Sequence, residues 1–423
     1  MFVKSVMPRF VKNSRGKRSI ELELETYEGK FRCSAPSGKS TGKSEVVSYH
    51  SKGIDRSMKI LKVFCKVLIH KNFIIKNING LKELNDLMIE FEARHGKFGG
   101  NVWYVVEGVF LKAAAKDIGK ELWEFINDDV NNGLKPKMPM PVGNCIGGGL
   151  HSEKVRNKRP DFQEFLLIPK ENSFGKAITK NFRAYEYAKK LLSEKPMIKS
   201  WELIRSRLRE WRRLRNDEGA WATGRSNEEV LEILKRVAKR YNLRIGLDVA
   251  SSSFFNGEYY KYENKNLIRD RVDEVDYIGK LIRKFGIFYI EDPMDEEEFG
   301  GFKSILERTK KSRKKSLIVG DDLTTTNYKR VQRAVRGGAI NSMIIKPNQI
   351  GSILEVKKVV SYCKKHDIIM VFSHRSGETM DDILADYCVG FGGQFLKAGI
   401  YGKERLIKLR RVMMIERSLG RLR

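Results

Sequence analysis

From about residue 136 onwards, short apolar runs alternate with amphipathic helical stretches, and this alternation restricts the folds open to the chain. Helical stretches such as "SNEEVLEILKRVAKRY" and "GSILEVKKVVSYCKKH" stand between several of the runs. Strand–helix alternation at this spacing predicts βα units and a parallel sheet, and more than five such units favour a closed α/β barrel over an open sheet. The runs are "FQEFLLIP", "LRIGLDVAS", "FGIFYIEDP", "SLIVGDDL", "NSMIIKP", "IIMVFSHR" and "GQFLKAG".

The first part of the chain follows a different pattern. Residues 1–50 hold short alternating runs that predict a small antiparallel sheet, and residues 55–130 show the i, i+3/i+4 apolar spacing of helices. The segment "LKPKMPMPVGN" then interrupts the helical pattern with three prolines. We therefore expect two domains, an amino-terminal α+β capping domain over residues 1–135 and an α/β barrel over residues 136–423.

Ionisable residues stand directly at the ends of the apolar runs. A single charge at such a position is usually a solvated strand end, but here the pattern recurs about one βα unit apart. In a barrel all of these residues converge on the carboxy-terminal mouth, where such folds place their chemistry. The residues are Asp248, Glu291, Asp321, Lys346, His374 and Lys397.

Three of these strand ends carry carboxylates. Asp248, Glu291 and Asp321 are hard oxygen donors without Cys or His between them in the pattern, and neighbouring carboxylates repel one another unless a cation lies among them. Such ligands suit magnesium rather than zinc. The alternative, a set of salt bridges to Lys346 and Lys397, leaves the clustering of the carboxylates unexplained.

The remaining strand ends are cationic. Lys346, Lys397, His374 and the adjacent Arg375 indicate an anionic substrate that carries a carboxylate or a phosphate. A lysine close to a divalent ion and other cations has a lowered pKa, so it can act as a base near neutral pH. A metal beside a lysine base suggests abstraction of a proton alpha to a carboxylate, with the metal stabilising the enolate.

Motifs along nearly the whole chain resemble those of the enolase family. "NSRGKRSIELEL" is similar to the family's D-S-R-G-N-P-T-V-E-V, and "APSGKSTGKSE" is similar to its first mobile loop, A-P-S-G-A-S-T-G. The K-P-N-Q and G-G-G-x-H forms resemble archaeal members. The other matching motifs, in family order, are "GGGLH…PDFQEFLLIP", "NDEGA", "IGLDVASS", "YIEDPM", "VGDDLTTTN", "IIKPNQIGS", "FSHRSGETMDD", "FLKAG" and "ERL".

The resemblance implies a reaction and a fold. It implies a magnesium-dependent lyase of glycolysis and gluconeogenesis that interconverts 2-phosphoglycerate and phosphoenolpyruvate through an enolate. It also implies an amino-terminal α+β domain followed by an eight-stranded α/β barrel with a modified start. Family membership further implies two magnesium ions in each active site and at least a homodimer.

The resemblance also implies a role for each site residue. Lys346 would remove the alpha proton, and Glu218 would be the general acid on the departing hydroxyl, supported by Glu164. The first magnesium ligands would be Asp248, Glu291 and Asp321. The phosphate would be bound by His374, Arg375 and Ser376, and the carboxylate by Lys397. The other residues expected to contact substrate are His151, which lies in the second mobile loop, Glu164, Glu291 and Asp321.

The Gly/Ser-rich stretch "SAPSGKSTGKSE" invites comparison with a phosphate-binding P-loop. Its register lacks the first glycine of that motif, and the preceding "SIELELETYEGKFRCSA" reads as an antiparallel hairpin rather than a buried parallel strand. The resemblance instead implies that this loop closes over the substrate and offers Ser40 to a second magnesium ion.

The sequence departs from the family pattern in three places. Ala220 stands where the family usually has a second glycine after the acid, and it would be strained if that position needs a positive φ angle. The stretch "KPMIKSWELIRSRLREWRRLR" is longer and more basic than expected. In the first loop, Lys39 and Ser44 replace the common alanine and histidine.

Charge and composition leave further alternatives open. The formal net charge is +29, with denser basic runs at "ERTKKSRKK" and at "IRSRLREWRRLRN", which could form a helix that carries Trp201 and Trp211. Nucleic-acid or other polyanion contact is one interpretation, and a compositional bias on solvated faces is the other. A different acid dehydratase of the enolase superfamily, or a basic nucleic-acid-binding or surface-binding protein on an enolase scaffold, also stays open.

Cysteine usage and the lack of apolar segments bear on location. Five unpatterned cysteines argue for a reducing compartment, against structural zinc and against a disulfide framework. The start of the chain has no apolar signal region, and no apolar run approaches the length of a membrane span. We therefore expect a cytoplasmic protein.

Overall fold

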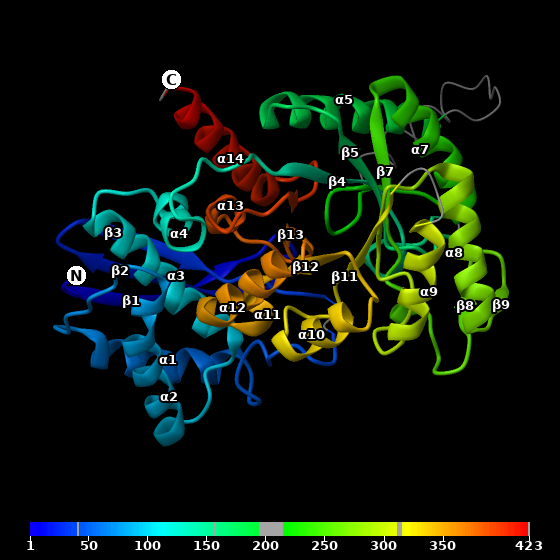
Figure 1. Cartoon of the computed structure of the whole chain (residues 1–423). Coiled ribbons are helices and arrows are strands. Elements are labelled where there is room, and N and C mark those ends of the chain that lie inside the picture. The colour runs from blue at the N-terminus through cyan, green and yellow to red at the C-terminus, as the bar shows by residue number, and fades with distance from the viewer. Residues whose placement is uncertain (40–41, 156, 194–214, 311–314, 422–423) are drawn as a thin grey trace, which may run out of the picture.

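The computed structural model describes residues 1–39, 42–155, 157–193, 215–310 and 315–421. Its amino-terminal third lies to one side of a barrel that the remainder of the chain forms (Figure 1). Ser40 and most of the basic run around Trp201 and Trp211 lie outside the described residues, so the expected helix there stays a prediction.

An antiparallel sheet opens the chain, in the order β1-β2-β3 within the described part. Its strands are β1 (Ser5–Lys12), β2 (Arg18–Thr26) and β3 (Gly29–Ser34). Thr26 pairs with Gly29, so a two-residue turn joins β2 to β3 and confirms the predicted hairpin. Ile20, Leu22 and Leu24 are fully buried on the face of β2 that the helices cover.

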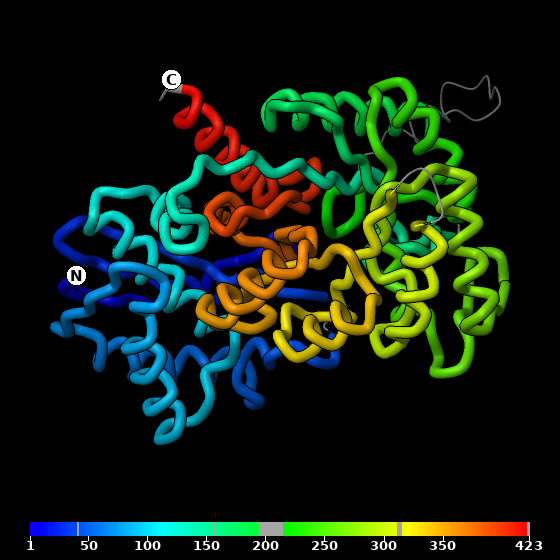
Figure 2. Tube along the Cα trace, viewed as in Figure 1, coloured from blue at the N-terminus to red at the C-terminus, as the bar shows by residue number. Residues whose placement is uncertain are grey.

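Helices pack on this sheet and join it to the barrel. Helix α3 contacts β2 and β3 and also α11 (Pro347–Ile350), and α4 packs against α13 (Ile383–Gly390). Figure 2 accordingly shows the blue-to-cyan chain beside the orange segment of the barrel. The helices are α1 (Ile54–Leu68), α2 (Lys82–His95), α3 (Gly100–Asp117) and α4 (Leu122–Asn131), with a short 3₁₀ turn at Ile78–Leu81.

Among the described residues, eight strands close into a barrel in the order β4-β5-β7-β10-β11-β12-β13-β14, and β14 pairs with β4 to complete the ring. The short strand β6 (Trp221–Ala222) also pairs with β4, at Ile146 and Gly147. This closure confirms the predicted fold class. The barrel strands are β4 (Met140–Gly147), β5 (Glu164–Pro169), β7 (Leu243–Asp248), β10 (Tyr289–Glu291), β11 (Leu317–Gly320), β12 (Ser342–Ile345), β13 (Ile369–Ser373) and β14 (Phe395–Lys397).

The start of the barrel differs from a uniform parallel sheet. Strand β5 runs antiparallel to both β4 and β7, whereas the other neighbours around the ring are parallel. The run "FQEFLLIP" is therefore a strand, as predicted, but not a parallel one. The connection from β4 to β5 contains a 3₁₀ turn at Gly149–His151 and, among its described residues, no α-helix of the kind that usually forms a parallel crossover.

Strand β4 begins inside the proline-rich segment that we interpreted as a break in the pattern. Pro141 is its second residue and pairs with Leu396 of β14. A proline is tolerated near the first residue of a strand, so the break and the strand coexist. The domain boundary near residue 136 stays a prediction.

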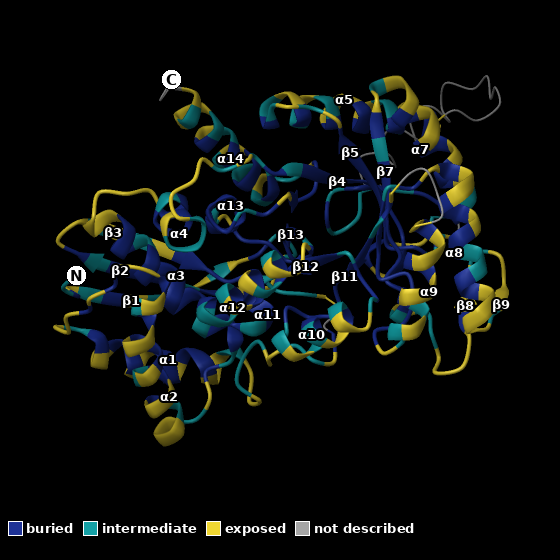
Figure 3. Cartoon of the chain, viewed as in Figure 1, coloured by how far each residue is buried: buried dark blue, intermediate teal, exposed yellow. Residues whose placement is uncertain are grey.

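Helices surround the barrel with their buried faces turned inward and their exposed faces outward (Figure 3). A small hairpin of β8 (Tyr260–Tyr262) and β9 (Leu267–Arg269) lies at the periphery. The helices are α5 (Phe174–Ser193), α7 (Asn227–Tyr241), α8 (Arg271–Phe285), α9 (Phe299–Lys310), α10 (Tyr328–Arg336), α11 (Pro347–Ile350), α12 (Ile353–Lys365), α13 (Ile383–Gly390) and α14 (Lys403–Arg421). None of the helices among the described residues is long and apolar enough to cross a membrane.

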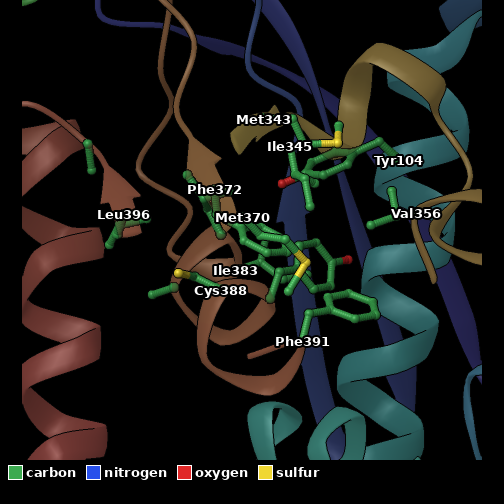
Figure 4. Close-up of a cluster of buried hydrophobic side chains, with 14 of the residues drawn as sticks. Tyr104, Met343, Ile345, Val356, Met370, Phe372, Ile383, Cys388, Phe391 and Leu396 are labelled. Carbon is green, nitrogen blue, oxygen red and sulfur yellow. The ribbon is translucent and has the colours of Figure 1, made fainter. Parts of the chain in front are cut away.

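Two layers of apolar side chains hold the barrel in place. An inner cluster fills its interior with side chains from seven of its strands, among them Val142, Tyr289 and Phe395. An outer cluster continues into the amino-terminal helices, and Figure 4 shows Tyr104 of α3 beside Met343 and Ile345 of β12. The two parts of the chain therefore share one continuous core, which fixes how the amino-terminal loops meet the barrel mouth.

Candidate active site

A cavity of about 270 Å³ lies at the carboxy-terminal ends of the barrel strands. Asp248, Glu291 and Lys397 are the last residues of β7, β10 and β14, and Asp321, Lys346 and His374 directly follow β11, β12 and β13. The structure thus brings the predicted strand-end residues together. Those that line the cavity, with the other predicted residues around it, are His151, Glu164, Glu218, Asp248, Asp321, Lys346, His374, Arg375, Ser376 and Lys397.

Lys397 lies at the centre of a buried group of carboxylates. Its Nζ is 2.8 Å from Asp248 Oδ2, 2.8 Å from Glu291 Oε1 and 3.4 Å from Glu164 Oε1. Burial opposes its charge, but Asp248 and then Glu164 and Glu291 outweigh burial and raise the pKa of Lys397 well above its usual value. Glu291 does not line the cavity itself and reaches it through this lysine.

Lys346 donates a short hydrogen bond to Asp321. Burial, Arg375 and Lys397 all lower the pKa of Lys346, as predicted for a crowded cation. Asp321 outweighs them, so the pKa of Lys346 is raised above its ordinary value rather than lowered. Our prediction of a lowered pKa assumed a divalent ion beside the lysine, and in its place the structure has a direct ion pair.

The structure thus contains the salt bridges of the alternative interpretation, but Lys346 and Lys397 do not balance the negative charge of the carboxylates around them. Asp292 and Asp322 stand beside Asp321, with one ligand atom of each within 4.8 Å of the others. Burial and Asp248 raise the pKa of Glu291 to about 8, and burial and Asp321 raise that of Asp322 to about 7. The carboxylates outnumber the two lysines, and their mutual repulsion together with burial favours the protonated forms of Glu291 and Asp322.

This donor set fits a divalent cation. The carboxylates at the ends of β7, β10 and β11 are hard oxygen ligands, and the excess negative charge among them is what such an ion neutralises. The predicted ligands Asp248 and Glu291 each contact Lys397, whereas Asp321 belongs to the carboxylate group with Asp292 and Asp322.

His151, Glu164 and Glu218 form a second buried group whose ligand atoms lie within 4.8 Å of one another. Burial, and next the charge of Glu218, raise the pKa of Glu164 well above its usual value. Burial also opposes the charge of Glu218, but His151 and then His374 outweigh it and lower the pKa of Glu218. Of the two carboxyls, Glu164 therefore has the greater affinity for a proton. The Glu218 carboxylate accepts a hydrogen bond of 3.0 Å from Asn144 Nδ2.

The predicted phosphate-binding residues lie on the loop after β13. Arg375 is buried and forms an ion pair with Glu45, at 2.9 Å and 3.1 Å from its two carboxylate oxygens. Both ring nitrogens of His374 and the Ser376 hydroxyl are buried and have no hydrogen-bond partner within the described part of the chain. Such unpaired polar groups are costly unless a ligand satisfies them, so they mark the part of the cavity that is prepared for one.

Sequence reasoning did not single out several residues that shape this site. Asp292, directly after Glu291, accepts hydrogen bonds from the backbone amides of Asp321 (2.9 Å) and Asp322 (2.7 Å). Its place beside a predicted ligand, in "YIEDP", was the available signal. Glu45 also went unnoticed, because nothing in a loop sequence says that its last residue pairs with Arg375.

Ala220 is not strained. The positive φ angle in this turn is that of Gly219, at 81°, and Ala220 is not among the residues with positive φ. The side chain of Asn216 shapes the turn by accepting hydrogen bonds from the amides of Glu218 (3.0 Å) and Ala220 (2.9 Å). The replacement of the family's second glycine therefore carries no backbone cost here.

Two family models match the chain. One is described as the enolase C-terminal TIM barrel domain and matches residues 135–422, and the other as the enolase N-terminal domain and matches residues 3–126.

Three curated proteins named enolase, all from archaea, are similar over nearly their whole length. The protein of Methanosphaera stadtmanae is 34% identical over 429 residues, with 99% of this chain and 97% of the relative covered. That of Picrophilus torridus is 33% identical over 423 residues, with 99% of each chain covered. That of Thermoplasma acidophilum is 31% identical over 425 residues, with 99% and 98% covered.

Proposed function

The chain belongs to the enolase family, and from that premise we propose how its residues carry out the reversible dehydration of 2-phosphoglycerate to phosphoenolpyruvate. The activity is that of a phosphopyruvate hydratase, a hydro-lyase that breaks a carbon–oxygen bond. One observation carries the proposal. A single cavity holds a lysine beside an excess of carboxylates together with the buried pair Glu164 and Glu218.

The first step is removal of the proton from C2 of 2-phosphoglycerate. Lys346 would take this proton as a neutral amine, a form that a divalent ion would favour by drawing Asp321 out of its ion pair with the lysine, and the electron pair of the broken C–H bond moves into the substrate carboxylate. Lys397 lies among the carboxylates at the ends of β7 and β10 and is the cation that faces the substrate carboxylate. The substrate phosphate replaces Glu45 as a partner of Arg375 and satisfies Ser376 and His374.

The second step is loss of the C3 hydroxyl. Glu218 delivers a proton to this hydroxyl, so that water leaves and the C2–C3 double bond forms. Glu164, whose pKa is raised by burial and by the charge of Glu218, is the store from which Glu218 regains a proton. His151, 3.3 Å from Glu218 through Nδ1, orients this carboxyl.

Asp248, Glu291 and Asp321 would hold the first of two magnesium ions, and Ser40 would contribute to the second. A divalent ion at this place supplies positive charge next to the substrate carboxylate and thereby stabilises the doubly charged enolate. The donor chemistry and the charge excess described above support this assignment, and Asp292 holds Asp321 in place through its backbone amide.

The cellular setting follows from the same membership. We infer a homodimer or a higher homo-oligomer that acts in glycolysis and gluconeogenesis in the cytoplasm. All five cysteines are buried and unpaired, as suits a reducing compartment. The alternative acid dehydratase is not favoured, because both enolase family models match and the residues proposed as base and acid are all present.

The test is phosphoenolpyruvate formation from 2-phosphoglycerate, followed by absorbance on the purified chain. We expect turnover that vanishes on chelation and returns with magnesium. Asp248→Ala should lose turnover at any magnesium concentration, whereas substitution of the exposed Asp86 should not. Full turnover in excess chelator would refute the metal assignment, and the absence of turnover in the magnesium-loaded wild type would refute the function.

A further inference from the structure

Lys39 stands in the first loop where the family commonly has alanine, and it reaches across the mouth of the cavity. Its Nζ donates a hydrogen bond of 2.7 Å to the Leu150 carbonyl and another of 2.9 Å to Asp217 Oδ2. Its side chain is 35% exposed and that of Asp217 31% exposed, so the contact is partly shielded from water.

The two residues that Lys39 contacts directly precede His151 and the proposed acid Glu218. Leu150 is followed by His151, and Asp217 is followed by Glu218, and His151 Nδ1 lies 3.3 Å from Glu218 Oε1. The two turns also meet directly, through a backbone hydrogen bond of 3.4 Å from the Asp217 amide to the His151 carbonyl. The Lys39 ammonium group therefore bridges the turn before His151 and the turn before Glu218 without contacting either of these two side chains.

The contacts of Lys346 do not involve this bridge. Its side chain pairs with Asp321, and its backbone amide donates to Thr326 Oγ1 at 3.0 Å. These groups belong to the ends of β11 and β12 and to the segment between them. A change at Lys39 can therefore alter the contact between His151 and Glu218 while it leaves Lys346 in place.

We propose that Lys39 is a positioning residue for the second step of the reaction. By bridging Leu150 and Asp217 it sets the spacing of His151 and Glu218, and so it promotes loss of the hydroxyl but not abstraction of the proton. The inference rests on the proposed function. Arg15 Nε also approaches Asp217, at 3.7 Å, so Asp217 keeps one cation when Lys39 is removed and the effect is partial.

The experiment compares two rates in deuterated water for Lys39→Met, Lys39→Arg and the wild type. The first is uptake of deuterium at C2 of 2-phosphoglycerate, and the second is formation of phosphoenolpyruvate. Charge-assisted and partly exposed contacts of this kind predict a loss of about three- to tenfold in product formation for Lys39→Met. Exchange at C2 should stay within about twofold of the wild type, and Lys39→Arg should recover most of the loss because arginine donates to both acceptors.

The control variant is Lys82→Met, which removes an exposed lysine–aspartate contact of 2.7 Å on α2, outside the cavity lining. It should leave both rates unchanged. Asp217→Asn tests the other end of the bridge, and the double variant with Lys39→Met should lose no more than the larger single effect. Thermal unfolding of each variant shows whether a loss reflects the fold.

Three outcomes would overturn the inference. They are equal losses of exchange and product in Lys39→Met, no loss of either, and full additivity of Lys39→Met with Asp217→Asn. A wild type without exchange or product contradicts the proposed function itself, so the two failures are distinct.

Discussion

Lys346 and Glu218 divide the proposed proton transfers between them, and isotope exchange can separate their roles. Lys346→Ala should abolish both deuterium uptake at C2 and formation of phosphoenolpyruvate, because the base is needed for either. Glu218→Gln should abolish product yet retain exchange, because Lys346 and its partner Asp321 are untouched. Proton transfer alone contributes roughly 10²–10⁴-fold, so each loss should be at least of that order.

The matched comparison is Glu45→Gln, which alters the partner of Arg375 but neither the base nor the acid. It should change the KM for 2-phosphoglycerate more than the exchange-to-product ratio. Exchange that persists in Lys346→Ala but disappears in Glu218→Gln would mean that the roles are reversed. Unchanged turnover in both variants would refute the assignment of this cavity.

At the scale of strands, the end of β10 supports the end of β11. The Asp292 carboxylate accepts hydrogen bonds from two successive backbone amides, those of Asp321 and Asp322. Partners that orient a metal ligand typically change metal affinity by roughly 10–100-fold when they are removed. Asp292→Ala should therefore raise the magnesium concentration for half-maximal turnover by about tenfold or more.

Calorimetric titration of magnesium into Asp292→Ala measures the same loss without substrate. The exposed Asp86→Ala on α2 serves as the control and should bind magnesium as the wild type does. Unchanged magnesium affinity in Asp292→Ala would show that Asp321 keeps its place without the two hydrogen bonds.

At the scale of helices, Glu107 links α3 to α12, one of the helices around the barrel. Its fully buried carboxyl accepts a hydrogen bond from the backbone amide of Ile353, at the start of α12. Burial raises the pKa of Glu107 from an ordinary value of 4.5 to about 7. The folded chain therefore binds this proton more tightly than the unfolded chain, and the stabilisation is fully present below about pH 4.5 and lost as the pH rises through 7.

This linkage predicts a pH-dependent gap between the wild type and Glu107→Gln. The amide stays neutral, so thermal unfolding scans should show the variant gaining relative to the wild type between pH 5 and pH 8. The full shift in pKa corresponds to a change in the free energy of unfolding on the order of 3 kcal/mol, or to a change of several degrees in Tm. Glu90→Gln, on the exposed face of α2, should show no such trend, and a gap in Tm that stays constant with pH would contradict a neutral Glu107.

Most of the barrel could be predicted from local patterns in the sequence, because the alternation of strands and helices and the charges at strand ends are local properties. The direction of β5 was not predictable, since a buried apolar run reads the same for a parallel and an antiparallel strand. Strand β4 was hidden by Pro141 at its start. The proposed strand-end ligands could be predicted for the same local reason, whereas the pairing of Glu45 with Arg375 joins residues 330 positions apart and has no local signal.

At the scale of the whole molecule, the two parts of the chain meet over the same cavity. Lys39 and Glu45 come from the amino-terminal part, and both contact barrel residues at the mouth. The barrel therefore supplies the residues proposed as base and acid and the carboxylates, and the amino-terminal loop supplies Lys39 and Glu45, which contact barrel residues beside them. Isolated halves of the chain should for this reason lack the complete site.

The formal charge of +29 is also a property of the whole molecule. Surface carboxylates in the described part pair with cations, as Arg18 does with Asp55 and Lys284 with Glu232, and we expect the remaining surplus to reflect a basic composition spread over the solvated surface. A spread surplus attracts any polyanion through release of counterions, and such binding is weak, independent of base sequence and steeply dependent on salt. Two RNA oligonucleotides of unrelated sequence should therefore bind alike by fluorescence anisotropy and lose most of their affinity between about 50 mM and 200 mM salt.

Tight binding of one sequence at the higher salt concentration, abolished when Arg205, Arg209, Arg212 and Arg213 are neutralised together, would instead establish a dedicated nucleic-acid site in that basic stretch. Neutralising four lysines dispersed over the helices provides the control, because it removes the same charge without touching the stretch.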